Sequence, residues 1–148
     1  MTTSEKQLNT FLVEVFNDVL RLEESNLSTG SYRNLSVSEL HLLDAARTLP
    51  ADTALTMTAL SRKLGVSAGS LTVAVKALEQ KGYLCRKKCE IDKRRVLVQL
   101  TDTALGACEA HRQFHEKMIA DISDRLSQKE LASLDAALRI LHAFFTAL

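Results

Sequence analysis

The chain has 148 residues, a length that predicts one domain or one domain with helical extensions. Hydrophobic residues make up 46% and charged residues 25%, and the scarcity of glycine and proline favours a mostly helical globular fold. No apolar run approaches the ~20 residues of a membrane span, and the polar N-terminus lacks a signal-peptide pattern. Three cysteines without close metal-type spacing argue against a disulfide framework, so we expect a cytoplasmic protein rather than a membrane or secreted one.

The formal net charge of +1 conceals a strongly basic segment between Arg62 and Arg95. This segment holds ten basic and three acidic residues, a net charge of +7, whereas the rest of the chain sums to −6. Because local charge sets the field at a protein surface, the segment can attract a polyanion. A charge run alone is equally typical of a solvated surface, so the structural context decides between the two.

Helices are predicted for the first third of the chain. Apolar residues recur at every third and fourth position from about residue 5 to 26, a spacing that predicts an amphipathic helix. Ser36 and Glu39 form a capping box before a second helix that runs to about Leu49. Pro50-Ala51-Asp52 then breaks the helical pattern.

Two shorter helices follow. One is predicted over residues 56–64 and is stopped by Gly65, and the next is predicted over 68–81 with Ser67 as its N-cap. Two short helices joined by a Gly-Val-Ser turn have the form of a helix-turn-helix.

The basic segment ends in a predicted β-hairpin. Residues 83–88 and 95–100 are strand-like, and the charged residues 89–94 between them predict an exposed tip. A helix-turn-helix followed by a basic hairpin is a winged helix. The predicted fold is therefore mostly α with a small β-wing, and residues 36–100 form the winged helix-turn-helix lobe.

The C-terminal third is again predicted to be helical. A helix is expected from residue 101 to about 123, and Ser127 with Glu130 forms a second capping box before an apolar stripe that reaches Leu148. This stripe and the first helix carry more apolar surface than a small winged-helix core can cover. We therefore expect the helices over 5–26 and 101–148 to form a homodimer.

The most specific motifs surround the wing. They are Leu78-Glu79-x-Lys81-Gly82-Tyr83-Leu84, Asp92-x-Arg94-Arg95 and Leu100-Thr101. Together with the order of elements, they resemble the MarR family of transcriptional regulators over nearly the whole chain. The glycine usual after the Leu-Thr pair is Ala104 here, which affects only the entry to a helix. The resemblance implies that Arg94 enters the minor groove of DNA and that Asp92 orients it.

The N-terminal pattern narrows the resemblance further. It consists of Phe11-Leu12-Val13, Phe16-Asn17-x-Val19-Leu20, Glu23-Glu24 and Ser36-x-x-Glu39-x-His41. This pattern is similar to that of the fatty-acid synthesis repressors of streptococci and their relatives. The similarity implies long-chain acyl carrier protein as an effector that raises DNA affinity.

Nine residues are candidate DNA contacts. They are Ser67, Ser70, Leu71, Thr72 and Lys76 on the predicted second helix of the helix-turn-helix, and Lys87, Asp92, Arg94 and Arg95 on the wing. Hydroxyl groups can hydrogen-bond phosphates or base edges, and lysine neutralises phosphate. Many family members carry Arg or Lys where this chain has Val73 and Ala77. We therefore expect contacts to thymine methyl groups and DNA shape to take a larger share of recognition.

Histidines suggest a second chemistry. His111 and His115 are four residues apart, so they project from one face of a helix and could share one Zn²⁺. The resemblance to zinc-responsive MarR-family repressors implies the ligand set Glu24, His41, His111 and His115. The alternative is that these residues form a buried polar network with no metal. We expect that DNA binding requires no cofactor, and zinc is the one candidate. Cys89 among basic neighbours is a weaker candidate, for redox sensing.

These observations predict a ligand-responsive repressor that binds a pseudo-palindromic duplex as a homodimer. The resemblance implies fatty-acid synthesis genes as its targets. Within the family, the alternative is a zinc-responsive repressor of metal-uptake genes. If zinc is not the effector, we expect acyl carrier protein or a small molecule in its place. The alternative of another class is a winged-helix module that binds other proteins and no DNA. The sequence has no phosphate-binding glycine loop and no nucleophile motif, so we do not expect an enzyme. We also expect no membrane partner, because no apolar run is long enough to span a bilayer.

Overall fold

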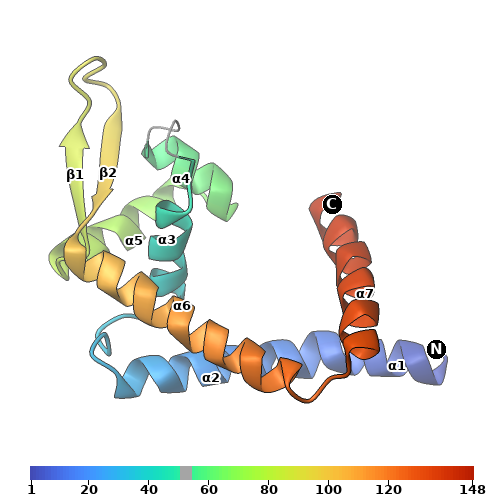
Figure 1. Cartoon of the computed structure of the whole chain (residues 1–148). Helices are drawn as coiled ribbons and strands as arrows, with labels where there is room; N and C mark the ends of the chain where they lie inside the picture. The colour runs from blue at the N-terminus through green and yellow to red at the C-terminus, as the bar shows by residue number, and fades with distance from the viewer. Residues whose placement is uncertain (51–54) are drawn as a thin grey trace. The chain divides into compact units, whose positions relative to one another are not determined.

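The computed structural model describes residues 1–50 and 55–148, which form two compact units, 1–110 and 111–148 (Figure 1). Residues 51 and 52 of the predicted helix break lie outside the described ranges. Within these ranges, no helix is long and apolar enough to cross a membrane.

The predicted N-terminal helix is confirmed, and it is longer than expected. It consists of α1 (Thr3–Thr10), a π-helical turn over Phe11–Val15, and α2 (Phe16–Thr29). The wider π turn has no counterpart in the periodicity analysis, because one changed turn barely alters the spacing of apolar residues. After a loop, α3 spans Val37–Arg47 and starts at the predicted capping box of Ser36 and Glu39.

The helix-turn-helix is present as predicted. Helix α4 spans Met57–Leu64 and α5 spans Ala68–Gln80. Between them, Gly65 adopts a left-handed backbone conformation with φ of 65°, which a glycine reaches without steric cost. The N–H of Val66 then donates to the carbonyl of Ser61 at 3.2 Å, which closes the end of α4 before α5 begins.

The wing is an antiparallel pair of strands, β1 (Leu84–Lys88) and β2 (Val96–Leu100). A further pairing was not predicted: the N–H of Val98 donates to the carbonyl of Leu55 at 2.7 Å, beside a β-bridge between Thr56 and Leu97. The residues just before α4 thus lie along β2. The wing is therefore attached by backbone pairing to the first helix of the helix-turn-helix.

One hydrophobic core holds the 1–110 unit together. Its fully buried members come from α3, α4, α5 and the start of α6 (Asp102–Ser123). The largest are Leu43, Leu60, Leu71, Val75, Leu78 and Cys108. Truncating one such leucine to alanine typically costs about 2–5 kcal/mol of stability, so this core fixes the orientation of α5.

The 111–148 unit consists of the rest of α6 and α7 (Gln128–Thr146), which begins at the predicted capping box of Ser127 and Glu130. No residue of α7, which is described in full, is buried. Its apolar side chains are largely exposed: Leu131, Leu134, Leu138, Ile140, Phe144 and Phe145.

An ion pair joins the two ends of the lobe's helical core. The Nζ of Lys81, directly after α5, donates to both carboxylate oxygens of Glu39 at 2.9 and 2.8 Å. The same carboxylate accepts the backbone N–H of Ser36 at 2.8 Å. Burial raises the pKa of Glu39, but the hydrogen bonds from Lys81 and Ser36 outweigh it and hold this pKa below its usual value of 4.5.

We predict that Glu39→Gln lowers the free energy of unfolding by about 1 kcal/mol at pH 7, since it removes a charge-assisted pair and part of a helix cap. A depressed carboxyl pKa stabilises the fold above the unfolded-state pKa and ceases to do so as the pH falls through the folded-state value. The difference between wild type and variant should therefore shrink below about pH 4.5 in urea unfolding. Glu90→Gln, at the exposed wing tip, serves as the control. A difference that persists unchanged at pH 3 would contradict the role of this ion pair.

Candidate nucleic-acid interface

The exposed side of α5 carries most of the predicted DNA contacts. Ser67, Ser70, Thr72 and Lys76 are all exposed. The contact predicted for Leu71 is corrected by the structure, because only 1% of this residue is exposed and its side chain lies in the core. Leucine at this position orients the helix and has no surface to offer a ligand.

The hydroxyl groups of α5 are already engaged within the helix. Ser67 Oγ accepts the N–H of Ser70 at 3.2 Å as the N-cap and donates to Ser70 Oγ at 3.0 Å. Thr72 Oγ1 donates to the carbonyl of Ala68 at 2.8 Å. Their remaining lone pairs can still accept hydrogen bonds from outside, whereas the hydroxyl protons of Ser67 and Thr72 are committed in this arrangement.

The wing tip presents Arg94 in a defined orientation. Its side chain is 92% exposed, and its Nε donates to Asp92 Oδ1 at 3.2 Å. The same oxygen accepts the backbone N–H of Arg94 at 3.1 Å, while the N–H of Arg95 donates to the carbonyl of Asp92 at 2.9 Å. The structure thus brings Asp92 and Arg94 together as the resemblance implied, with Asp92 both folding the tip and holding the guanidinium.

Basic side chains around the wing divide into two groups. Lys87 and Lys88 are exposed on β1. Arg86 instead pairs with Glu79 of α5, its Nε 2.7 Å from the carboxylate and its backbone N–H donating to the other oxygen at 3.0 Å. This pair ties the wing to α5, so Arg86 serves the fold and is largely neutralised.

A hollow beside the wing is lined in part by Arg62, a residue that the sequence analysis did not assign to the DNA interface. Its volume is about 560 Å³, and it is lined by Thr56–Ala59, Arg62 and Arg94–Val96. Three arginines, Arg62, Arg94 and Arg95, therefore line one concave surface. The signal for Arg62 was its charge alone, because only the pairing of the segment before α4 with β2 brings it near the wing.

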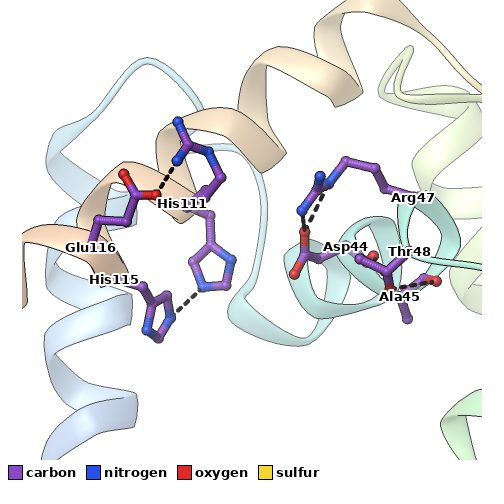
Figure 2. A network of polar contacts seen from close by, with 8 residues as sticks. Asp44, Ala45, Arg47, Thr48, His111, His115 and Glu116 are labelled. Atoms are coloured by element: carbon purple, nitrogen blue, oxygen red, sulfur yellow. Dashed lines mark hydrogen bonds and ion pairs between the residues drawn. The ribbon is translucent and has the colours of Figure 1, made fainter. Parts of the chain in front are cut away.

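The two histidines of α6 lie side by side in the 111–148 unit (Figure 2). His111 Nε2 is 2.9 Å from His115 Nε2, and His111 is buried. A hydrogen bond between two imidazoles requires one ring nitrogen to donate and the other to accept, so at least one ring of the pair is neutral. Neutral imidazole nitrogens are also the form that binds zinc.

In the 1–110 unit, the predicted ligands His41 and Glu24 have different surroundings. His41 Nε2 lies 3.2 Å from a carboxylate oxygen of Glu23, a buried residue that the sequence analysis did not select. Glu24 is exposed and, with His41, lines a hollow of about 770 Å³ between α2 and α3. Neighbouring glutamates on a helix point to different sides, and which one meets α3 depends on the packing of the two helices.

The cysteines differ sharply in accessibility. Burial raises the pKa of Cys108, so its thiol is a poor nucleophile. Cys85 is exposed and Cys89, the candidate redox residue, is half-buried at the wing tip.

Comparisons with known proteins decide the family. Residues 35–96 match the MarR family. The chain is also 31% identical over 111 residues to transcriptional regulator AdcR of Streptococcus pneumoniae serotype 2 (strain D39 / NCTC 7466), a match that covers 75% of this chain and 74% of that protein. The chain belongs to the MarR family. It is a MarR-family transcriptional regulator, and its relatives named here are regulators rather than enzymes.

Solved structures confirm the winged helix-turn-helix fold. Streptococcus pneumoniae FabT in complex with DNA has a TM-score of 0.89 and 31% identity, over 97% of this chain and 98% of FabT. Wild-type MarR from E. coli, in its apo form, has a TM-score of 0.67 and 26% identity, over 88% of this chain and 93% of that one.

Proposed function

We propose that this MarR-family regulator represses transcription by binding a pseudo-palindromic DNA duplex as a homodimer. The observation that carries the proposal is that one basic lobe presents both the exposed α5 face and the oriented Arg94 of the wing. FabT, which resembles this chain over nearly its whole length, was solved in complex with DNA. Chromosomal DNA as the partner also implies the cytoplasmic location that the sequence predicts.

The two parts of the lobe suit the two grooves of a duplex. The second helix of a helix-turn-helix enters the major groove, so α5 would lie there with Ser70 and Lys76 near phosphates or base edges. Arg94 would enter the minor groove, whose negative potential is greatest where A·T pairs make it narrow. Lys87, Arg62 and Arg95 would neutralise backbone phosphates between these two contacts.

We predict that Arg94→Ala weakens binding to the operator by about 1–3 kcal/mol, or roughly 5- to 150-fold, because a minor-groove guanidinium contact is lost. Fluorescence anisotropy with a duplex from upstream of the protein's own gene measures the change. Arg125→Ala, outside the basic segment, is the matched control. The wild-type affinity should also fall steeply with salt, with a slope near −0.9 per phosphate contact. Affinity that is insensitive to salt, or absent, would instead favour a protein-interaction module.

Homodimer formation is supported by apolar surface in each unit. Besides α7, the N-terminal helix exposes a second set of side chains: Leu8, Phe11, Leu12, Val13, Val15 and Phe16. Single exposed apolar residues are common, but contiguous stripes along whole helices mark interaction sites. A second copy of the chain fits both stripes, since dimerisation is typical of the MarR family and two-fold symmetry would present two α5 helices to two half-sites.

We predict that Leu134→Asp with Leu138→Asp dissociates the dimer, because each charge would be buried without a partner at the interface. Sedimentation velocity measures the oligomeric state, and DNA affinity should fall at least tenfold since one lobe alone binds a half-site. Ser133→Asp, on the polar side of α7, should leave the dimer intact. A wild-type chain that sediments as a monomer would overturn this part of the proposal.

Besides acyl carrier protein, zinc is a candidate effector. It is favoured by the close pair of imidazoles on α6. His111 and His115 would supply two nitrogen ligands. A bound Zn²⁺ would act as a structural ion that holds its ligands in one geometry. The sequence also leaves acyl carrier protein and small molecules as effectors.

We predict that zinc, compared with a chelator, changes the operator affinity of wild type by about 5- to 150-fold, the usual range of coupling between two sites. His115→Ala should abolish this response, whereas His142→Ala on α7 should retain it. Anisotropy with zinc titrated against the chelator measures both. Tight binding that is indifferent to zinc would return the histidine pair to a structural role, and acyl carrier protein would be titrated next.

A further inference from the structure

Val73 is an unusual residue on the exposed face of α5. It is 72% exposed, although valine has a modest helix propensity and no favourable interaction with water. Gly69 and Ala77 lie one turn on either side of it, and a side chain at Gly69 would meet open space. The centre of this face is therefore a narrow apolar strip, with Val73 as its one branched side chain.

The polar residues around Val73 leave little capacity for reading bases by hydrogen bonds. Bidentate recognition of a base pair in the major groove uses Arg, Lys, Asn or Gln. Between residues 67 and 79 the chain has no Arg, Asn or Gln, and Lys76 is the only lysine. The hydroxyl protons of Ser67 and Thr72 are directed to partners within the helix, and Glu79 is paired with Arg86.

An apolar side chain at this place has one natural partner on DNA. Among the groups that base pairs expose in the major groove, the C5-methyl group of thymine is the apolar one. An isopropyl group packed against this methyl removes both from water, whereas cytosine would place a polar amino group near it.

We propose that Val73 is a specificity-determining residue that recognises thymine methyl groups, one in each half of the operator. This inference rests on the proposed function, because it requires α5 to lie in the major groove. The apolar strip is narrow, so a single thymine step per half-site faces Val73. Specificity at that step comes from a methyl contact, while the lysines supply sequence-independent attraction to phosphates.

The test removes the methyl group from the DNA and the isopropyl group from the protein in turn. A duplex selected by the wild-type protein from a random pool serves as the probe, and each symmetric pair of thymines is replaced by uracil. One buried methyl group is worth about a fourfold change in affinity, so one pair of positions should show roughly a fifteenfold loss. In Val73→Ala, the thymine and uracil duplexes should bind within twofold of each other at that pair.

Val66→Ala is the matched control, since Val66 is an exposed valine in the turn before α5 and should keep the full discrimination. Val73→Ala should also keep the wild-type salt dependence, because no phosphate contact is removed. If the wild type binds its selected duplex but no uracil substitution changes the affinity more than twofold, the inference is wrong while DNA binding stands. The inference is equally wrong if Val73→Ala keeps the wild-type discrimination. If no duplex is enriched, the proposed function fails as well.

Discussion

Burial of Leu71, Val75 and Leu78 in the core is the constraint on which the lobe depends. These residues occupy positions i, i+4 and i+7 of α5, so their burial determines which side chains of that helix face solvent. With this face fixed, Val73 and Lys76 are presented outward on a rigid element. A helix held only by its ends would rotate, and the same sequence would then offer no defined surface.

Three further interactions attach the wing to the same framework. The backbone of Leu55 pairs with that of Val98, and the carboxylate of Glu79 receives Arg86. Thr101 lies between the end of β2 and the start of α6. Its Oγ1 donates to the carbonyl of Gly82 at 2.8 Å and accepts the N–H of Ala104 at 3.3 Å. One threonine therefore fastens the end of the hairpin to the start of α6. These contacts are distributed over both strands, so the wing is held to the helix-turn-helix at several points.

The features that could be predicted from the sequence are those with local causes. Capping boxes at Ser36 and Ser127 act over three residues, and the stop at Gly65 requires only one backbone conformation, so each was found where expected. The motif Asp92-x-Arg94 likewise closes on itself within three residues.

The features that were missed depend on distant partners. The pairing of Leu55 with Val98 joins positions more than forty residues apart, and nothing near Leu55 in the sequence signals a strand. The choice between Glu23 and Glu24 as the neighbour of His41 is set by how α2 rotates against α3. Leu71 was predicted to contact DNA because it lies on the second helix of the helix-turn-helix. Only the exposed face of that helix can contact DNA, and Leu71 lies on the buried face.

The attachment of the wing to both helices has a consequence for how repression can be relieved. A lobe whose contacts are internally fixed cannot adapt its span to the duplex, so the adjustable quantity in a dimer is the separation of its two lobes. B-DNA repeats the same groove every ~34 Å, and a pair of rigid lobes either matches that period or does not. In the proposed homodimer, an effector would therefore release the operator without touching any side chain that contacts DNA, because it would change the separation of the two lobes.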